Sequence, residues 1–267
     1  MYAHENGCPW TEGTCTEAAR YGHLECLTYA HENGCPWDTQ TCAEAARYGH
    51  MECITYAHEN GCPWNHTTSA AAGFSGRVDI LKYAHENGCE WSDETCSNAA
   101  ENGFLEVIKY AHENGCPWDE DTCSHAAWEG HLDILTYAHE NGCPWDEDAC
   151  SYAGEGGQLH CLKFLHANGC PWVERTCSAA AEYGHFAFLK WAHEHGCPWD
   201  KRTSSCAAWF GYLDILKYAI QNGCPWEEAE LLRTKHDHVK AWIRDNLPLS
   251  QGNAGNLNAG NLLSPVR

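Results

Sequence analysis

The chain of 267 residues contains 19 cysteines and 18 histidines, the side chains that most often bind metals or act as nucleophiles and bases. His31, Cys35 and Cys42 follow the spacing H-x3-C-x6-C, and similar triplets recur along the chain. Zinc prefers such ligands, but a structural zinc site needs four of them in a tetrahedron. The triplet has no constant fourth ligand, and the pattern is broken at Ser69, Ser204 and Ile220. A zinc-binding array is therefore the alternative hypothesis, and we expect no resident metal or cofactor.

A histidine recurs at one position of the chain, and Glu follows it at seven of the eight copies: His4, His31, His58, His85, His112, His139, His166 and His193. A catalytic site needs a nucleophile, a base and an orienting acid in one place. A feature repeated at regular intervals is not one site, so we expect no enzyme activity. We expect each of these histidines to bond a backbone carbonyl at the negative end of a helix.

The charge of the chain limits its partners. It has 16 basic and 37 acidic residues, a formal charge of −21. This balance argues against binding to nucleic acid or to anionic membranes, and it favours a protein partner with a basic segment. No run of about 18 apolar residues predicts a transmembrane helix, and the first residues do not resemble a signal peptide. We expect an intracellular monomer, cytoplasmic or nuclear.

The cysteines are expected to be reduced packing residues. At the position of Cys26 other copies have Ile80, Val107, Ile134, Phe188 and Ile215, which indicates packing rather than chemistry. Equivalent residues of neighbouring helices lie about 10 Å apart. A disulfide needs Cα atoms within about 7 Å, so a ladder of disulfides between equivalent cysteines is not expected.

The cysteines and histidines belong to an internal repeat. A tryptophan recurs every 27 residues, at 10, 37, 64, 91, 118, 145, 172, 199 and 226. The spacing defines eight repeats over residues 11–226, preceded by a partial repeat at 1–10. Residues 227–248 keep some apolar spacing and are expected to form degenerate capping helices. Residues 249–267 are rich in Gly and Asn and are expected to be a disordered tail.

Each repeat predicts two short helices. In residues 11–37 the first is expected from Thr14 to about Tyr21, with Thr14 as N-cap and Glu17 completing a capping box. Its apolar positions are small, so a neighbouring helix can approach closely. The second is expected from about Leu24 to Asn33. Gly22 is expected to end the first helix in the left-handed conformation, and Gly34 to end the second. Helices this short are stable only when they stack on neighbours.

The repeat resembles the ankyrin family. The stretch T-C-x-x-A-A-x-x-G-H-L-E-x-L is similar to the family pattern at Thr14, Ala18, Ala19, Gly22, His23, Leu24, Glu25 and Leu27, and E-N-G-C-P-W-D is similar to its turn. The resemblance covers residues 11–226 and implies an all-α solenoid of paired antiparallel helices. The unit has 27 residues instead of the usual 33, so we expect tight turns with little or no β-hairpin. Short repeats of this GCPW type resemble arrays of large DNA viruses and some protists.

The resemblance also predicts where a partner binds. The pair of residues after Ala-Ala varies among the repeats, and in ankyrin repeats this pair lies on the concave binding face. We expect a protein-interaction scaffold, with unconstrained surface variation as the other explanation of these positions. The expected contact residues are Arg20, Tyr21, Arg47, Tyr48, Phe74, Glu101, Asn102, Trp128, Glu129, Glu182, Tyr183, Trp209 and Phe210. His23, His50, His131 and His185 are expected to be partly exposed turn residues.

Overall fold

The computed structural model describes residues 10–248, and every regular element in that range is a helix. The first helices of the repeats are α2 (Glu12–Arg20), α4 (Thr39–Arg47), α6 (His66–Ser75), α8 (Glu94–Glu101), α10 (Glu120–Glu129), α12 (Glu147–Gly156), α14 (Glu174–Tyr183) and α16 (Lys201–Phe210). The second helices are α3 (Leu24–Glu32), α5 (Met51–Glu59), α7 (Val78–Glu86), α9 (Leu105–Glu113), α11 (Leu132–Glu140), α13 (Leu159–Ala167), α15 (Phe186–Glu194) and α17 (Leu213–Gln221). The predicted all-α fold of paired helices is confirmed. The predicted partial repeat, apart from Trp10, and the predicted tail lie outside the described residues.

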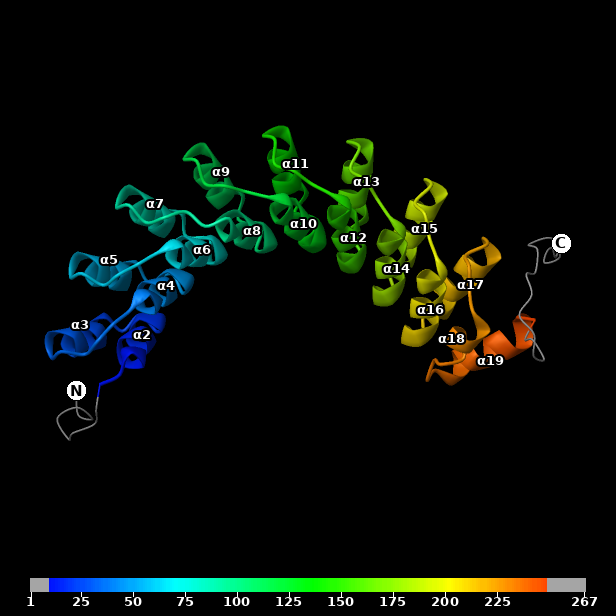
Figure 1. Cartoon of the computed structure of the whole chain (residues 1–267), viewed down its shortest axis with the longest axis horizontal. Helices are drawn as coiled ribbons and strands as arrows, with labels where there is room; N and C mark the ends of the chain where they lie inside the picture. The colour runs from blue at the N-terminus through cyan, green and yellow to red at the C-terminus, as the bar shows by residue number, and fades with distance from the viewer. Residues whose placement is uncertain (1–9, 249–267) are drawn as a thin grey trace. The chain divides into compact units, whose positions relative to one another are not determined.

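The chain divides into two compact units, residues 1–144 and residues 145–267. Within each unit the first helices pack side by side in one row, and the second helices form another row (Figure 1). Cys15, Ala18 and Ala19 of α2 are buried, as are Leu27 and Ala30 of α3. The small side chains of the first helix let neighbouring helices approach closely, which is why that row is the more closely packed.

The first helices begin earlier than predicted. Asp38 is the N-cap of α4, and its carboxylate accepts a hydrogen bond from the Gln40 N–H at 3.0 Å. Thr41, which holds the position of Thr14 in the next repeat, is fully buried inside the helix and is not the N-cap. The capping box expected at Thr14 and Glu17 is wrong, because α2 begins at Glu12 with Thr11 as its N-cap and Thr14 lies inside the helix. Both Asp38 and Thr41 are good cap residues by type. Only the packing of Thr41 in the core decides between them.

The predicted helix ends are confirmed, and the structure adds a reason for them. Gly22 and Gly34 have positive φ values of 67° and 83°. At Gly184 a Cβ atom would lie 2.5 Å from the ring of Tyr212, because that ring of the following repeat covers the glycine. His50 covers Gly22 in the same way. The side chain at the position of His50, which was predicted to lie in a partly exposed turn, therefore packs over the glycine of the preceding repeat.

Two further helices follow the last repeat. They are α18 (Glu228–Leu231), which packs on α16, and α19 (Asp237–Asn246). Leu231, Val239 and Ile243 are buried, so their apolar positions face the rest of the unit. No helix among residues 10–248 is long and apolar enough to cross a membrane.

Candidate interaction surface

The exposed aromatic residues gather at one position of the repeat. Among the described residues, the large hydrophobic side chains that are exposed are Tyr21, Tyr48, Tyr183, Trp209 and Phe210, with 43–62% of their surface accessible. All five belong to the variable pair after Ala-Ala or its counterpart, at the C-terminal ends of first helices. Exposed apolar side chains that gather on one part of a surface are typical of interaction sites.

In residues 10–144 the two arginines of the variable pairs contact the neighbouring first helix. The Arg20 guanidinium forms ion pairs with Glu44 and with Glu17, both at 2.9 Å. The Arg47 guanidinium lies 3.9 Å from the centre of the Phe74 ring, a cation–π contact. Both arginines therefore have partners on the next first helix, whereas Tyr21 and Tyr48 are exposed.

The remaining predicted residues lie at the same position of the other first helices. Glu101 and Trp128 are half-buried, whereas Asn102, Glu129 and Glu182 are exposed. The amide of Asn102 donates to the carbonyl of Asn98 at 2.9 Å and so extends α8 by a side-chain contact. The structure brings the thirteen predicted residues together as a stripe in each unit, not as a single cluster.

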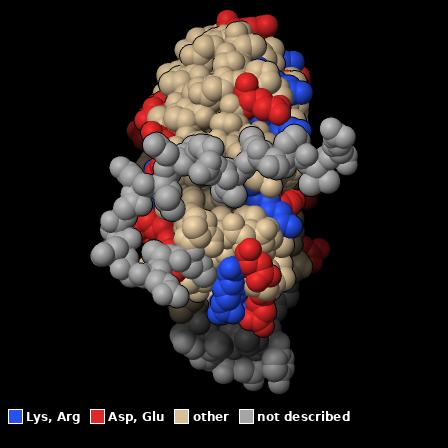
Figure 2. All heavy atoms as spheres, turned by 90° about the vertical axis from the view of Figure 1, so that its right-hand side faces the viewer, with Lys and Arg blue, Asp and Glu red and all other residues tan. Residues whose placement is uncertain are grey.

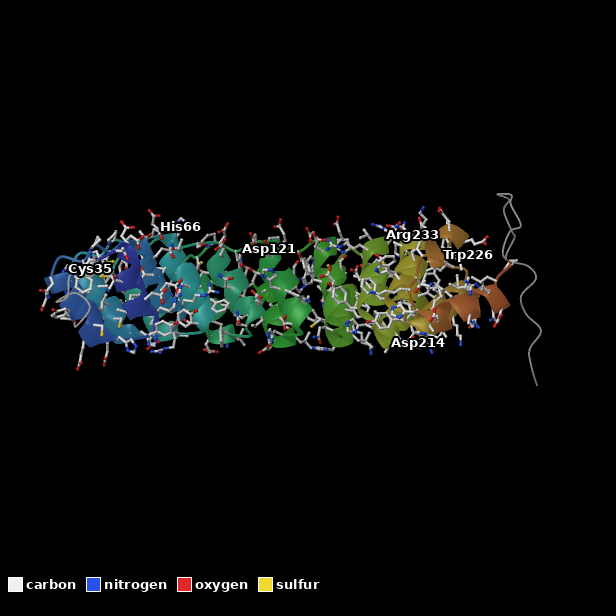
Figure 3. All side chains as sticks on the ribbon, turned by 90° about the horizontal axis from the view of Figure 1, so that it is seen from below. Cys35, His66, Asp121, Asp214, Trp226 and Arg233 are labelled. Atoms are coloured by element: carbon white, nitrogen blue, oxygen red, sulfur yellow. The ribbon has the colours of Figure 1, made fainter. Side chains whose placement is uncertain are left out.

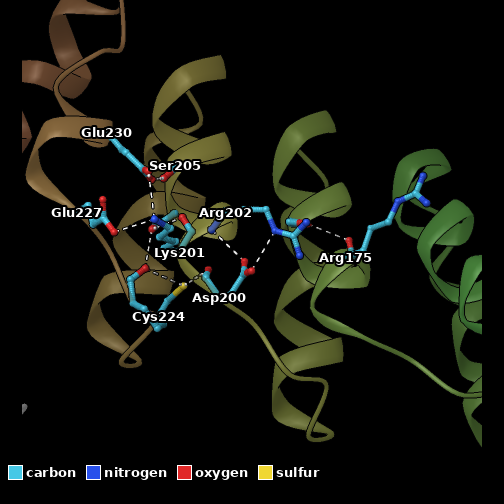
Figure 4. A network of polar contacts seen from close by, with 11 residues as sticks. Arg175, Asp200, Lys201, Arg202, Ser205, Cys224, Glu227 and Glu230 are labelled. Carbon is cyan, nitrogen blue, oxygen red and sulfur yellow. Dashed lines mark hydrogen bonds and ion pairs between the residues drawn. The ribbon is translucent and has the colours of Figure 1, made fainter.

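A pocket of about 340 Å³ opens beside the aromatic pair at the end of α16, lined by Ser205, Cys206, Trp209, Phe210, Glu230 and Arg233. The Glu230 carboxylate accepts hydrogen bonds from Ser205 at 2.8 Å and from Lys201 at 3.4 Å (Figure 4). These bonds, that of Ser205 above all, lower the pKa of Glu230 and keep it anionic. Sequence reasoning missed Glu230 and Arg233 because they lie beyond the last regular repeat.

An acidic cluster lies at the start of α10 in the first unit. Asp119, Glu120 and Asp121 are consecutive, and Figure 3 shows Asp121 on the same edge as His66 in the first turn of α6. Burial and the neighbouring charge of Asp121 raise the pKa of Asp119. A cationic group placed here would relieve this repulsion, so the edge favours basic ligands.

The charge is distributed unequally between the units. Residues 1–144 carry 5 basic and 23 acidic side chains, a net charge of −18. Residues 145–267 carry 11 basic and 14 acidic side chains, a net charge of −3. On the C-terminal face that Figure 2 presents, acidic side chains lie next to basic ones. The acidic field therefore belongs almost entirely to the first unit.

The recurring histidines pack rather than bond carbonyl groups as predicted. The His31 ring stacks on Trp37 of its own repeat, with centroids 3.7 Å apart, and meets Tyr56 of the next repeat edge-on. The carbonyl bond predicted for this histidine occurs at a different one. His50 Nε2 lies 3.0 Å from the Arg20 carbonyl oxygen, and His185 Nε2 lies 2.9 Å from that of Glu155. His31 lies in the last turn of α3 and His50 lies directly before α5. Both are next to a helix end, so the sequence alone did not show which of them would bond a carbonyl group.

The residues considered as zinc ligands do not converge. The His31 ring stacks on Trp37, while the Cys35 thiol donates to the Thr11 carbonyl at 3.4 Å. Between residues 10 and 248, no three His, Cys, Asp or Glu side chains gather where they could hold a metal ion. No observation in the described chain therefore favours the zinc hypothesis over packing.

Comparison with known proteins supports the ankyrin resemblance. Residues 177–220 match the family model described as ankyrin repeats in many copies. A crystal structure of the human ASB11 ankyrin repeat domain matches the fold with a TM-score of 0.51 and 20% sequence identity. That match covers 59% of this chain and 84% of the human one. No curated protein matches the sequence. The described array therefore has the fold of an ankyrin repeat domain, a type of domain that generally binds other proteins.

Proposed function

We propose that this ankyrin repeat array is a non-catalytic scaffold that binds a protein partner through the C-terminal ends of its first helices. The observation that carries the proposal is that every exposed large aromatic side chain in residues 10–248 lies at these ends. Tyr and Trp are enriched among the residues that contribute most to protein binding. Unconstrained surface variation would scatter such side chains over both rows of helices.

The partner has a basic segment. The first unit carries a net charge of −18, and burial, together with the charge of neighbouring acidic groups such as Asp121, raises the pKa of Asp119. Complementary charge speeds association more than it adds affinity, and salt weakens it. We assign the first unit to the attraction of the partner and the aromatic end of α16 to its retention.

Side chains of catalytic type have other roles in this fold, which supports a non-catalytic function. The His31 ring stacks on Trp37, and the Cys35 thiol donates to a backbone carbonyl. His185 bonds the carbonyl of Glu155. A general base or nucleophile must be free to exchange a proton with a substrate.

The experiment is an affinity purification from cells with two matched baits. One carries Tyr183→Ser, Trp209→Ser and Phe210→Ser; the control carries Lys82→Ser, Glu86→Ser and Lys190→Ser, which are exposed on second helices. The proposal expects a partner that the wild type and the control retain and the aromatic variant loses. Equal recovery of all partners by the aromatic variant would contradict the assigned surface.

A further inference from the structure

Two buried cysteines of one repeat lie against each other although they are distant in sequence. Cys96 in α8 donates to the sulfur of Cys116, which follows α9, at a distance of 3.9 Å. Cys116 in turn donates to the Ser92 carbonyl at 3.4 Å. In Cys15–Cys35, Cys42–Cys62, Cys123–Cys143 and Cys177–Cys197 the two thiols also lie close enough that one raises the pKa of the other. The expectation from sequence considered only equivalent cysteines of neighbouring repeats and missed these pairs.

The two sulfurs of a pair differ in depth. Cys96, the inner cysteine, is fully buried, whereas Cys116, the outer one, is 4% exposed. Every outer cysteine in residues 10–248 has this slight exposure, and every inner one has none. A small reagent therefore meets the outer sulfur first, with the inner sulfur directly behind it.

Two repeats show that the inner sulfur is dispensable for packing. Ser69 takes the inner position opposite Cys89, and its hydroxyl donates to the Glu90 carbonyl at 2.9 Å. Cys89 keeps its own bond to the Asn65 carbonyl at 3.2 Å. Ser204 and Cys224 repeat this arrangement, and Figure 4 shows Cys224 bonded to Asp200. Serine can therefore occupy the inner position and form hydrogen bonds there. A thiol at this position is not needed for folding, but it can react with the outer thiol.

We propose that these pairs are sites of reversible oxidation, in which the outer and inner thiols of one repeat close to a disulfide when a peroxide is the oxidant. The outer thiol releases its proton, and the thiolate attacks one oxygen of hydrogen peroxide. The O–O bond breaks, a sulfenic acid forms, and the departing hydroxide takes up that proton to give one water. The inner sulfur then attacks the outer sulfur and displaces its hydroxyl group, which leaves as the second water. Two thiols lose two protons and two electrons, and the peroxide gains them.

The fold makes closure local. Each cysteine moves its sulfur by rotation about one bond, and the sulfurs must approach from 3.9 Å to roughly 2.05 Å. The bond joins the first helix of a repeat to the turn after its second helix, so it ties both helices of that repeat together. Burial raises the pKa of Cys89 to about 11, so thiolate is scarce at neutral pH and the reaction is slow.

The test treats the folded full-length chain with hydrogen peroxide in the presence of dimedone, which traps sulfenic acids. Cys26→Ser is the background, because Cys26 is exposed and would link molecules to each other. We expect dimedone on Cys89, which has no partner thiol, and a Cys96–Cys116 disulfide with little dimedone on Cys116. Peptide mapping without reductant measures both products, and dithiothreitol should remove the disulfide.

Two variants exchange the behaviour of the two repeats. Cys96→Ser should make Cys116 trap dimedone as Cys89 does, and Ser69→Cys should end trapping at Cys89 and create a disulfide there. Circular dichroism verifies that both variants fold, since each residue already occurs at the equivalent position of another repeat. Equal dimedone labelling of Cys116 and Cys89 in the parent chain would overturn the proposal. So would resistance of all these thiols to peroxide in the folded chain while they react in urea.

Discussion

The two units of the array share one repeat plan but differ in what they offer a partner. Residues 1–144 have a net charge of −18, and their exposed aromatics Tyr21 and Tyr48 lie beside arginines held in contacts. Residues 145–267 have a net charge of −3 and expose Tyr183, Trp209 and Phe210, the last two beside a pocket. The buried positions that the repeats share build the same fold in both units. The exposed positions differ, so that most of the negative charge lies in the first unit and the aromatic pair beside the pocket lies in the second.

The largest effect is expected at the aromatic end of the second unit. Trp209→Ala and Phe210→Ala should each lower the affinity for the partner by about 2 kcal/mol, roughly 30-fold, because buried aromatic anchors dominate protein interfaces. Calorimetric titration with the purified partner measures the loss at low and high salt. A loss that disappears at high salt would mean that the second unit also acts through charge.

The interior of the two units provides the next comparison. In α6 and α12 a glycine replaces the second alanine of Ala-Ala, and an added Cβ would lie 2.4 Å from the Thr95 carbonyl oxygen at Gly73 and 2.8 Å from that of Thr176 at Gly154. Gly73→Ala and Gly154→Ala should each lower the free energy of unfolding by about 1–2 kcal/mol, with the greater loss at Gly73. Urea denaturation measures both changes.

Gly13→Ala is the matched control for these two variants. It lies in α2, and its added Cβ would have only a contact of 3.6 Å with the Thr11 hydroxyl. The substitution should leave stability unchanged or raise it, because alanine favours a helix over glycine by up to about 1 kcal/mol. If Gly73→Ala and Gly13→Ala behaved alike, close packing of the first helices would not limit residue size there.

The repeat period and the residue types were enough to predict the fold, because a small buried face such as Cys15, Ala18 and Ala19 can only stack on a neighbour. The helix start was not predictable, since Asp38 and Thr41 are both cap residues and tertiary burial of Thr41 decides. The exposed aromatics were foreseeable from their variation among repeats. The pocket residue Glu230 and the Cys96–Cys116 contact were not, because they join elements outside the period or at different repeat positions.

A motif present in both units tests the electrostatic part of the comparison. Asp119-Glu120-Asp121 and Asp146-Glu147-Asp148 begin α10 and α12, but Asp148 is paired with Arg175 at 2.9 Å. Conversion of the first motif to Asn-Gln-Asn should slow association with the basic partner several-fold at low salt, or about 1 kcal/mol, and the same change in the second motif should do less. Asparagine preserves the helix caps.

Stopped-flow measurement of the association rate over a range of salt concentrations distinguishes the two motifs. The first variant should also show a weaker dependence of the rate on salt, because it removes charges that steer the encounter. Equal slowing by both variants would indicate that the partner senses the total charge of the chain and not that of the first unit.

The smallest effect is expected from pH at a histidine of the second unit. The His193 ring stacks on Trp199 at 3.6 Å, and Tyr218 meets it edge-on. Burial lowers the pKa of His193, and the charge of Glu194 opposes this only in part. The unfolded chain therefore binds a proton more readily, so stability should fall as pH decreases below about 6.5 and level off below the folded pKa.

His193→Gln should reduce the difference in unfolding free energy between pH 7.5 and 5.5 by less than about 1 kcal/mol, because the half-exposed ring is screened by water. Denaturant titrations at the two pH values measure it, and a variant that loses stability equally at both would show that the ring acts by packing alone.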